Sequence, residues 1–355
     1  MSLRIAAMLV ALSGLTLLAQ EKEKKAPPAV DRQAQLDLII EDFVKARKAS
    51  NAAMRSAKSA EEQKAAEALL PKESNFLPRV YKLIANGASD ETAADALAFA
   101  VFGLNTKDTG IYDAIAKNFV KTDKIRRFLQ MAMSNAPEAA KPVLEKVLAS
   151  NPSKEMQGLA CYALASMAFE KEGPATAKEA ETFFARVEKE FADVKAGRGS
   201  TLGEMAKGSL FELRNLQVGM KAPITESKDL KGAKASLKDH AGKVVILDIW
   251  ATWCGPCRAM IPHEREMVEK FKGKPFALIS VSADDDKKEL EEFIAKEPMP
   301  WVHWWDGADA ALLKQWNIRF YPSLYVIDAK GVIRYKHIRG DELEKAVEKL
   351  LAETK

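Results

Sequence analysis

Cysteine and histidine are scarce in this chain of 355 residues, which has three cysteines and four histidines. So few cysteines exclude a small scaffold held together by disulfides. The single Cys-x-x-Cys pair has no second pair and no histidine cluster to complete a zinc site, so neither a metal nor a cofactor is expected. Cys161 stands alone in an apolar helical stretch and is expected to be a buried, inert thiol.

Long blocks of one charge are also missing. The chain has 54 Lys and Arg residues against 50 Asp and Glu residues, which leaves a net charge of +4. Without a basic arm or stripe, a nucleic-acid partner is not expected.

A long apolar run is absent too. The apolar segment 5–19 follows the basic residue Arg4 and ends at Ala19, before a polar stretch. It is shorter than the roughly 20 residues that span a bilayer, so residues 1–19 are predicted to be a cleaved secretory signal peptide. A retained membrane anchor formed by residues 5–19 and a buried core helix are the alternatives. Export predicts a periplasmic or secreted protein.

Runs of β-branched residues are rare between residues 31 and 216, where alanine is frequent and proline or glycine recurs at intervals. This pattern predicts a series of helices, preceded by a linker at 20–30 that contains Pro27 and Pro28. Ser153 is predicted to cap one of these helices. No fixed repeat length is evident, so an irregular bundle and a helical repeat array both remain open.

The pattern changes past residue 217. Continuous or alternating apolar runs predict strands, and helical patterns lie between them. Strands are predicted at 244–250, 276–281, 324–327 and 332–338, and helices at about 256–272, 285–297, 308–316 and 341–353. The expected fold class is α + α/β: an all-helical N-terminal domain at 31–216, then a domain at 218–355 with a mixed sheet and helices on both faces.

The sequence Trp253-Cys254-Gly255-Pro256-Cys257 follows the first predicted strand directly and opens a helix. Unpaired N–H groups and the positive dipole end at a helix N-terminus stabilise a thiolate, so the pKa of Cys254 is expected to fall. Cys257 lies three residues later on the same helical face and is expected to be more buried. Cys254 is therefore predicted to be the nucleophile and Cys257 the resolving thiol.

Asp248 lies inside the apolar strand that precedes this motif. A buried carboxylate is costly without a role or a partner, and burial raises its pKa. Asp248 is therefore predicted to accept the proton of Cys257 during resolution. The alternative is a structural acid with a permanent partner.

Together these residues resemble the thioredoxin superfamily, and most closely its extracytoplasmic TlpA/ResA-like thiol-disulfide oxidoreductases, over about 218–355. Asp248 corresponds to the family's buried acid, Tyr321-Pro322 to its cis-proline, and 328–331 to its hairpin turn. The segment 284–306 resembles the family's central insert.

The resemblance implies a redox disulfide between Cys254 and Cys257. It also implies that Pro322 is cis and presents the backbone of Tyr321 to an extended substrate, with Trp253, Gly255 and Pro256 lining the substrate site. An ordinary loop proline is the alternative. Tyrosine departs from the Thr, Ile or Val that often precedes this proline in the family, which leaves substrate choice open.

The predicted function is a thiol-disulfide oxidoreductase, and Gly255-Pro256 resembles the dipeptide of reducing thioredoxins. Its partners would be protein thiols and disulfides, with electrons from a membrane thiol donor of the DsbD/CcdA kind. Cytochrome c maturation is one task of such families. A scaffold protein that recruits partners and a thioredoxin-like peroxidase are the alternatives, although Ala251 replaces the threonine that the peroxidase would need.

Two further groups of residues have simpler explanations. The acidic run 284–286 is predicted to cap a helix and form its solvated first turn, rather than to bind a cation. The remaining tryptophans are expected mostly to pack in the core; they are Trp301, Trp304, Trp305 and Trp316.

Overall fold

The structure of the chain is a computed structural model that describes residues 31–354, except 86–87, 135, 172, 198 and 308–309. The predicted signal peptide at 1–19 and the linker at 20–30 lie outside the described residues. Among the described helices, none combines the length and the hydropathy needed to cross a membrane.

The chain divides into two compact units. The first contains the chain up to Met131 together with Pro137–Lys146, and the second contains Ala132–Ala136 and the chain from Val147 onward. The second unit therefore contains both the last helices of the predicted helical region and the sheet. The domain boundary near residue 217 stays a prediction.

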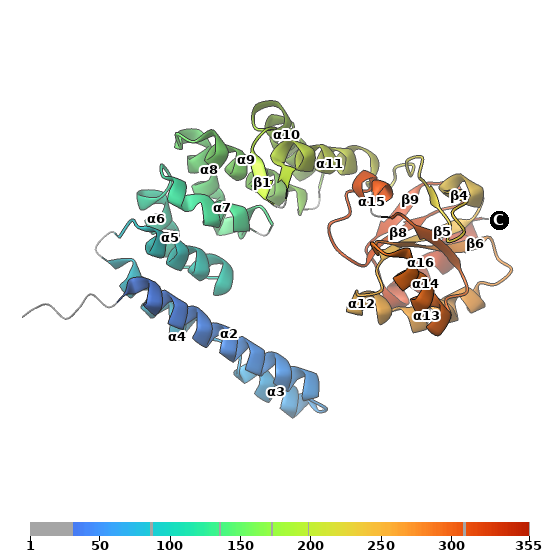
Figure 1. Ribbon diagram of the computed structural model, residues 1–355, viewed down its shortest axis with the longest axis horizontal. Helices are drawn as coiled ribbons and strands as arrows, with labels where there is room; N and C mark the ends of the chain where they lie inside the picture. Colours follow the sequence, from blue (N-terminus) through green and yellow to red (C-terminus); the bar gives the residue numbers. More distant parts are fainter. Residues whose placement is uncertain are drawn as a thin grey trace, which may run out of the picture. The chain divides into compact units, whose positions relative to one another are not determined.

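The described part of the first unit is helical (Figure 1), and buried apolar side chains of its helices form a core. In this core Phe43 meets the rings of Phe76 and Phe99 edge to face, at centroid distances of 5.6 and 5.3 Å. Helix α8 continues into the second unit. The α-helices are α2 (Arg32–Ser56), α3 (Ala60–Ala68), α4 (Glu73–Leu83), α5 (Glu91–Ala98), α6 (Thr109–Asn118), α7 (Arg126–Ala132) and α8 (Lys141–Ser150).

Helix α9 (Lys154–Phe169) is the buried element of the second unit's helical part. It begins at the predicted cap, because the side chain of Ser153 accepts a hydrogen bond from the Met156 amide. The helix is apolar on nearly every face, as expected for a helix enclosed by others, and it packs against α10 (Pro174–Glu190) and α11 (Leu202–Asn215). A short hairpin of β1 (Lys195–Gly197) and β2 (Ser200–Thr201) interrupts this otherwise helical region.

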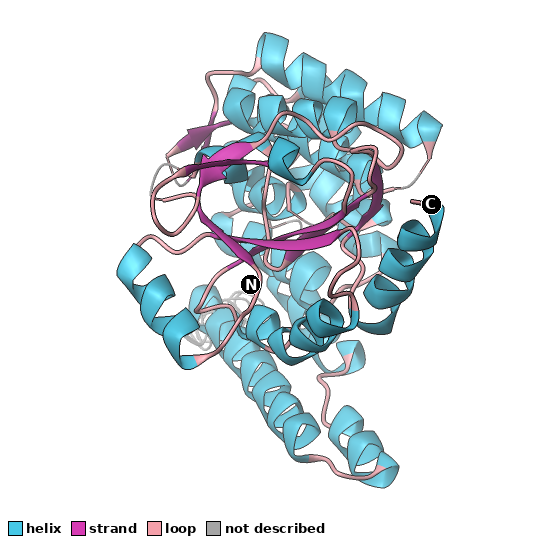
Figure 2. Cartoon of the chain, turned by 90° about the vertical axis from the view of Figure 1, so that its right-hand side faces the viewer, coloured by secondary structure: helices cyan, strands magenta, loops and turns pink. Residues whose placement is uncertain are grey.

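The C-terminal part contains a sheet whose strands are magenta in Figure 2, and its five strands have the order β7-β6-β5-β8-β9. Strands β5, β6 and β7 are parallel, β8 runs antiparallel to β5, and β9 runs antiparallel to β8 and so in the same direction as β5. The strands are β5 (Val244–Trp250), β6 (Phe276–Ser282), β7 (Val302–Trp305), β8 (Ser323–Ile327) and β9 (Ile333–Lys336), and a separate hairpin pairs β3 (Glu226–Lys228) with β4 (Lys234–Ser236).

Helices cover both faces of this sheet. Helices α13 (Ile261–Lys270) and α16 (Gly340–Glu353) pack on one face, and α15 (Ala311–Gln315) packs on the other. Helix α14 (Lys287–Lys296) contributes Leu290 to the cluster around the cysteines. The predicted fold class, helices followed by a thioredoxin-like mixed sheet, is confirmed.

Central strand β5 is buried along its whole length and positions the functional motif. Because side chains alternate across a sheet, Ile246, Asp248 and Trp250 share one face, and Leu247 and Ile249 belong to the core on the other face. The predicted helix at 256–272 forms as two pieces, a single turn α12 (Gly255–Arg258) and then α13.

Candidate functional site

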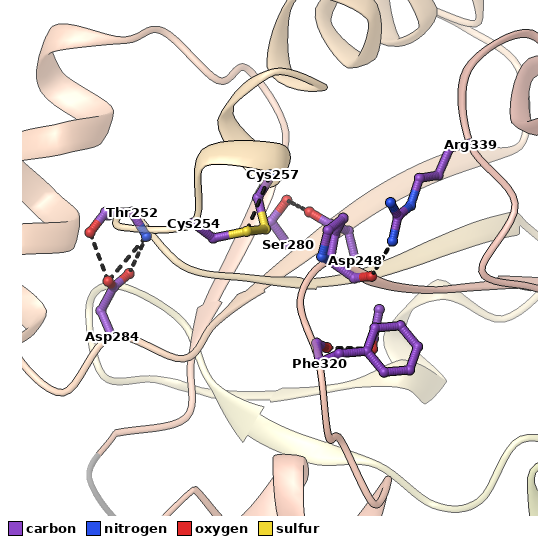
Figure 3. The surroundings of a disulfide bond; sticks show 10 residues. Asp248, Thr252, Cys254, Cys257, Ser280, Asp284, Phe320 and Arg339 are labelled. Atoms are coloured by element: carbon purple, nitrogen blue, oxygen red, sulfur yellow. Dashed lines mark hydrogen bonds between the residues drawn. A yellow bond between two sulfur atoms is a disulfide. The ribbon is translucent and has the colours of Figure 1, made fainter. Parts of the chain in front are cut away.

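The two cysteines lie at the junction between β5 and α12. Cys254 is the N-cap residue of α12, and its Sγ accepts a hydrogen bond from the backbone N–H of Cys257 at 3.2 Å (Figure 3). The two sulfurs are bonded at 2.02 Å. A sulfur that receives an N–H hydrogen bond at a helix start is stabilised as a thiolate once the disulfide is reduced.

Exposure does not distinguish the two cysteines in this bonded state. Cys254 is 5% exposed and Cys257 is 4% exposed. The predicted greater burial of Cys257 is thus only marginal. The assignment of nucleophile and resolving thiol rests instead on which sulfur receives the backbone N–H.

Asp248 lies on the β5 face that leads to the cysteines and is 4% exposed. Its Oδ2 accepts a hydrogen bond from Ser280 Oγ at 3.3 Å, and Ser280 Oγ in turn accepts one from Trp301 Nε1 at 2.8 Å. Its Oδ1 is buried without a hydrogen-bond partner. Burial raises the pKa of Asp248 to about 7, although the Ser280 hydrogen bond and the positive charge of Arg339 oppose the rise. Such a carboxyl group exchanges a proton near neutral pH.

A second buried carboxyl group, Glu264 on α13, was not anticipated from the sequence. Glu264 is 2% exposed and its Oε1 has no hydrogen-bond partner. Burial and the nearby charge of Asp248 raise the pKa of Glu264 well above its ordinary value. A signal for it exists, because Ile261 and Met267 mark the apolar face of α13 and Glu264 occupies the same face midway between them.

The peptide bond between Tyr321 and Pro322 is cis, and the carbonyl oxygen of Pro322 accepts a hydrogen bond from Arg339 at 3.1 Å. The ring of Tyr321 meets that of Trp253 edge to face, at a centroid distance of 5.5 Å. Trp253 is 64% exposed, and Gly255 beside Cys254 is also exposed.

These contacts bring the predicted substrate-binding residues together. Pro256 is exposed next to the redox pair, and Tyr321 packs against the buried cluster that contains both cysteines. The result is an apolar, accessible rim around the disulfide. Phe320, which precedes Tyr321, is also exposed, and its ring packs against that of His337.

Asp284 holds the loop that carries the motif. It accepts hydrogen bonds from the backbone N–H of Thr252 at 3.1 Å and from Thr252 Oγ1 at 2.7 Å (Figure 3). The hydroxyl of Ser282 donates a further one. The prediction that residues 284–286 cap a helix is right for Asp286, which caps α14. It is wrong for Asp284, which is buried because Thr252 and Ser282 supply its partners.

The remaining predicted side chains lie in the core or at its edge. Trp304 and Trp316 are fully buried, and Trp301 and Trp305 are partly buried. Cys161 is buried in α9, where burial raises the pKa of its thiol to about 12. Within the described part of the chain, no three His, Cys, Asp or Glu side chains converge as ligands for a metal.

Comparison with known proteins identifies the C-terminal part. Residues 217–351 match the redoxin family. The chain is 34% identical to the thioredoxin-like protein YneN of Bacillus subtilis over 141 residues, which are 38% of this chain and 79% of YneN. It is 28% identical to the thiol-disulfide oxidoreductase ResA of Bacillus thuringiensis over 145 residues, 41% of this chain and 83% of ResA.

A solved structure gives a match of similar extent. The thioredoxin domain of a thiol-disulfide oxidoreductase from Bacteroides vulgatus is 32% identical, with a TM-score of 0.37, and the match covers 39% of this chain and 99% of that domain. Through residues 217–351, this chain belongs to the redoxin family of the thioredoxin superfamily and is a thiol-disulfide oxidoreductase similar to ResA.

Proposed function

We propose that this protein reduces disulfides of other proteins outside the cytoplasm, with Cys254 as the attacking thiol and Cys257 as the resolving thiol. The hydrogen bond from the Cys257 N–H to Sγ of Cys254 supports this assignment. It favours negative charge on Cys254, and the thiolate is the form of cysteine that attacks a disulfide.

The reaction takes place in two exchanges. The Cys254 thiolate attacks one sulfur of the substrate disulfide, the substrate S–S bond breaks, and the first substrate thiolate leaves and takes a proton from water. Cys257 then passes its proton to Asp248 and attacks Sγ of Cys254. The bond between Cys254 and the substrate breaks, the second substrate thiolate leaves, and the Cys254–Cys257 disulfide forms. The substrate gains two electrons and the dithiol loses two.

Asp248 is suited to receive that proton because of its position and its environment. It lies on the β5 face that leads directly to the cysteines, and its pKa of about 7 matches the pH at which the exchange must run. Its Oδ1 has no hydrogen-bond partner, so a lone pair on this oxygen is available to take up a proton.

The substrate would bind on the apolar rim. The exposed ring of Trp253 and the half-buried ring of Tyr321 offer apolar contacts to the residues that flank a substrate cysteine. The backbone of Tyr321, just before cis Pro322, would pair with an extended substrate segment. Gly255 and Pro256 complete the rim.

The direction and the location of the reaction rest on the sequence. The Gly255-Pro256 dipeptide resembles that of reducing thioredoxins, and the segment 1–19 has the pattern of a signal peptide. A reductase in that compartment requires an electron source, for which a membrane thiol donor of the DsbD/CcdA kind is the proposed partner.

The decisive experiment traps the intermediate. Reduced protein is mixed with an aryl disulfide that releases one coloured thiolate on attack and a second on resolution. Cys257→Ser is expected to release only the first and to accumulate a mixed disulfide at Cys254, detected by mass spectrometry. Cys254→Ser is expected to release neither.

Cys161→Ser is the matched control, because it removes a thiol that is buried away from this site. Its two-step release should equal that of the wild type. Full activity in Cys254→Ser would eliminate the proposed mechanism. The Cys257→Ser variant, expressed in a host that exports it, would also identify physiological partners as covalent adducts.

A further inference from the structure

The buried pair of carboxyl groups beneath the disulfide is the feature that the mechanism above leaves unexplained. Asp248 alone would suffice as a proton acceptor, yet the acid Glu264 occupies a buried position of α13 between apolar residues. Burying a carboxyl group without a partner destabilises a fold. A role in the exchange reaction would account for it.

Packing brings the two carboxyl groups to the same interface between β5 and α13, close enough for the charge of Asp248 to act on Glu264. On β5, Asp248 lies between Ile246 and Trp250 on one face of the strand. On α13, Glu264 lies one turn from Ile261 and one turn from Met267. Ile246 packs in the same cluster as Met267, and Trp250 in the same cluster as Ile261. The two acids therefore occupy the same level of the interface between strand and helix.

Each of the two carboxyl groups has one oxygen without a hydrogen-bond partner. Asp248 Oδ1 and Glu264 Oε1 are both buried, and neither meets a donor. A deprotonated carboxylate only accepts hydrogen bonds, whereas a protonated carboxyl group also donates one. One proton held between the two acids supplies the missing donor for both.

We infer that Glu264 is a positioning residue that holds a proton toward Asp248, and thereby keeps Asp248 ionised and ready to accept the proton of Cys257. This inference rests on the proposed function. The proton donated by Glu264 stabilises the Asp248 carboxylate before resolution. After Asp248 has taken the proton from Cys257, the pair carries two protons, and one of them is released to water.

Charges on the surrounding elements agree with this assignment. Burial and the charge of Asp248 both favour protonated Glu264, and Arg339 at the start of α16 favours ionised Asp248. Ser280 on β6 donates to the other oxygen of Asp248. Glu344 of α16 does not enter the pair, since it binds His263 and Lys270 on the outer side of α13.

The test measures the rate of the second, resolving release as a function of pH in three variants. Glu264→Leu removes the donor, so the midpoint of the rate profile should move to higher pH. A midpoint displaced by about one unit lowers the rate about tenfold below the midpoint and leaves it unchanged well above it. Glu264→Gln keeps an N–H donor that cannot ionise and should restore the wild-type midpoint.

Glu266→Gln is the matched control, because it removes an exposed acid from the same helix and should change nothing. The inference is overturned if the Glu264→Leu profile matches the wild type, if its midpoint moves to lower pH, or if its rate falls equally at every pH. It is also overturned if Glu264→Gln lowers the rate of the resolving release at low pH as much as Glu264→Leu does.

A spectroscopic measurement covers the case in which Glu264→Leu does not fold. At about pH 8, above the pKa of Asp248, the wild type should retain the infrared carbonyl band of a protonated buried acid, and Glu264→Gln should lack it. A wild type without that band contradicts the inference. A wild type that releases neither thiolate would instead eliminate the proposed function, and this inference with it.

Discussion

Two cysteines in this chain are almost equally buried, but their environments have opposite effects on the reactivity of the thiol. Cys161 in α9 is surrounded by apolar side chains, its Sγ donates to the carbonyl oxygen of Phe183, and burial raises its pKa to about 12. Cys254 between β5 and α12 receives an N–H hydrogen bond instead. Burial alone therefore does not determine the reactivity of a thiol. What matters is whether the surrounding backbone offers donors or acceptors.

The same contrast separates the buried acids of the two regions. Glu212 on α11 is enclosed by Lys336, Arg319 and Asn317, which all contact its carboxylate. Asp248 and Glu264 each keep an oxygen without a partner. The carboxylate of Glu212 on α11 is therefore fully paired, whereas the two carboxyl groups between β5 and α13 are left able to exchange protons.

The largest expected effect is on thiol alkylation. In the reduced native protein near pH 7, we expect iodoacetamide to label Cys254 about 10⁴-fold faster than Cys161, because only the thiolate reacts and the pKa of Cys161 is about 12. Peptide mass spectrometry gives both rates in one sample. Equal labelling of the two sites would break the comparison.

The next largest expected effect is the loss of stability when Glu212, the buried acid with a full set of partners, is removed. Glu212→Ala is expected to lower the free energy of unfolding by about 3–5 kcal/mol, because it leaves the charge of Lys336 without its partner. Glu181→Ala, which breaks only an exposed pair with Arg214, should cost less than about 1 kcal/mol. Denaturant titration compares them. A loss of less than about 1 kcal/mol for Glu212→Ala would show that the contacts of its carboxylate contribute little to stability.

Removal of Asp248, the buried acid with an unpartnered oxygen, should slow the exchange reaction. Asp248→Asn is expected to slow the resolving step near pH 7 by about 10²-fold, because the amide does not accept a proton. In the wild type this rate should fall as the pH drops below the Asp248 pKa of about 7. The second release from the aryl disulfide measures both effects. A pH-independent loss would contradict proton transfer to Asp248.

Asp248→Asn should also stabilise the oxidised protein, in the opposite direction to its effect on rate. The folded pKa of Asp248 is raised from 3.8 to about 7, so ionisation destabilises the fold as the pH rises through that window. The variant should gain roughly 1–3 kcal/mol above about pH 7 and nothing below about pH 4. Thermal unfolding at the two extremes measures the difference, and an equal gain at both would refute this account.

The smallest effect concerns the loop that carries the motif. Thr252→Val removes the 2.7 Å hydrogen bond from Oγ1 to Asp284 and should cost about 1 kcal/mol of stability, with a few-fold slower attack by Cys254. Thr182→Val removes an exposed hydroxyl that bonds only within its own helix, and should have almost no effect. An unchanged attack rate in Thr252→Val would show that this anchor is dispensable.

Much of the fold could be predicted from the sequence, because its long elements carry local signals. The strand run 244–250 matches β5, and the predicted helix at 341–353 matches α16 within one residue. Strand β7 was missed because its four residues show no alternation and its pairing with β6 joins segments about 20 residues apart. The short β1–β2 and β3–β4 hairpins were missed for a similar reason.

The site was predictable only where residues adjoin in sequence or interrupt a pattern. The cysteines form a motif, and Asp248 interrupts an apolar strand. Arg339 and Asp284 reach the site only through tertiary folding, so no local pattern marks them. The burial of Glu264 could be predicted, because it is an acid on an apolar helix face. Its proposed role could not, because that role depends on its position near Asp248 in the folded chain.

The contacts of Glu212 with Lys336, Arg319 and Asn317 limit how this protein can be shortened. The redoxin match begins at residue 217, which suggests a fragment cut at that point as the minimal redox module. Such a fragment would lose Glu212, and Lys336 on β9 would keep its charge with no counter-ion. The working module for biochemistry should therefore start upstream of α11, and transplanting the reductase into another protein requires carrying that helix along.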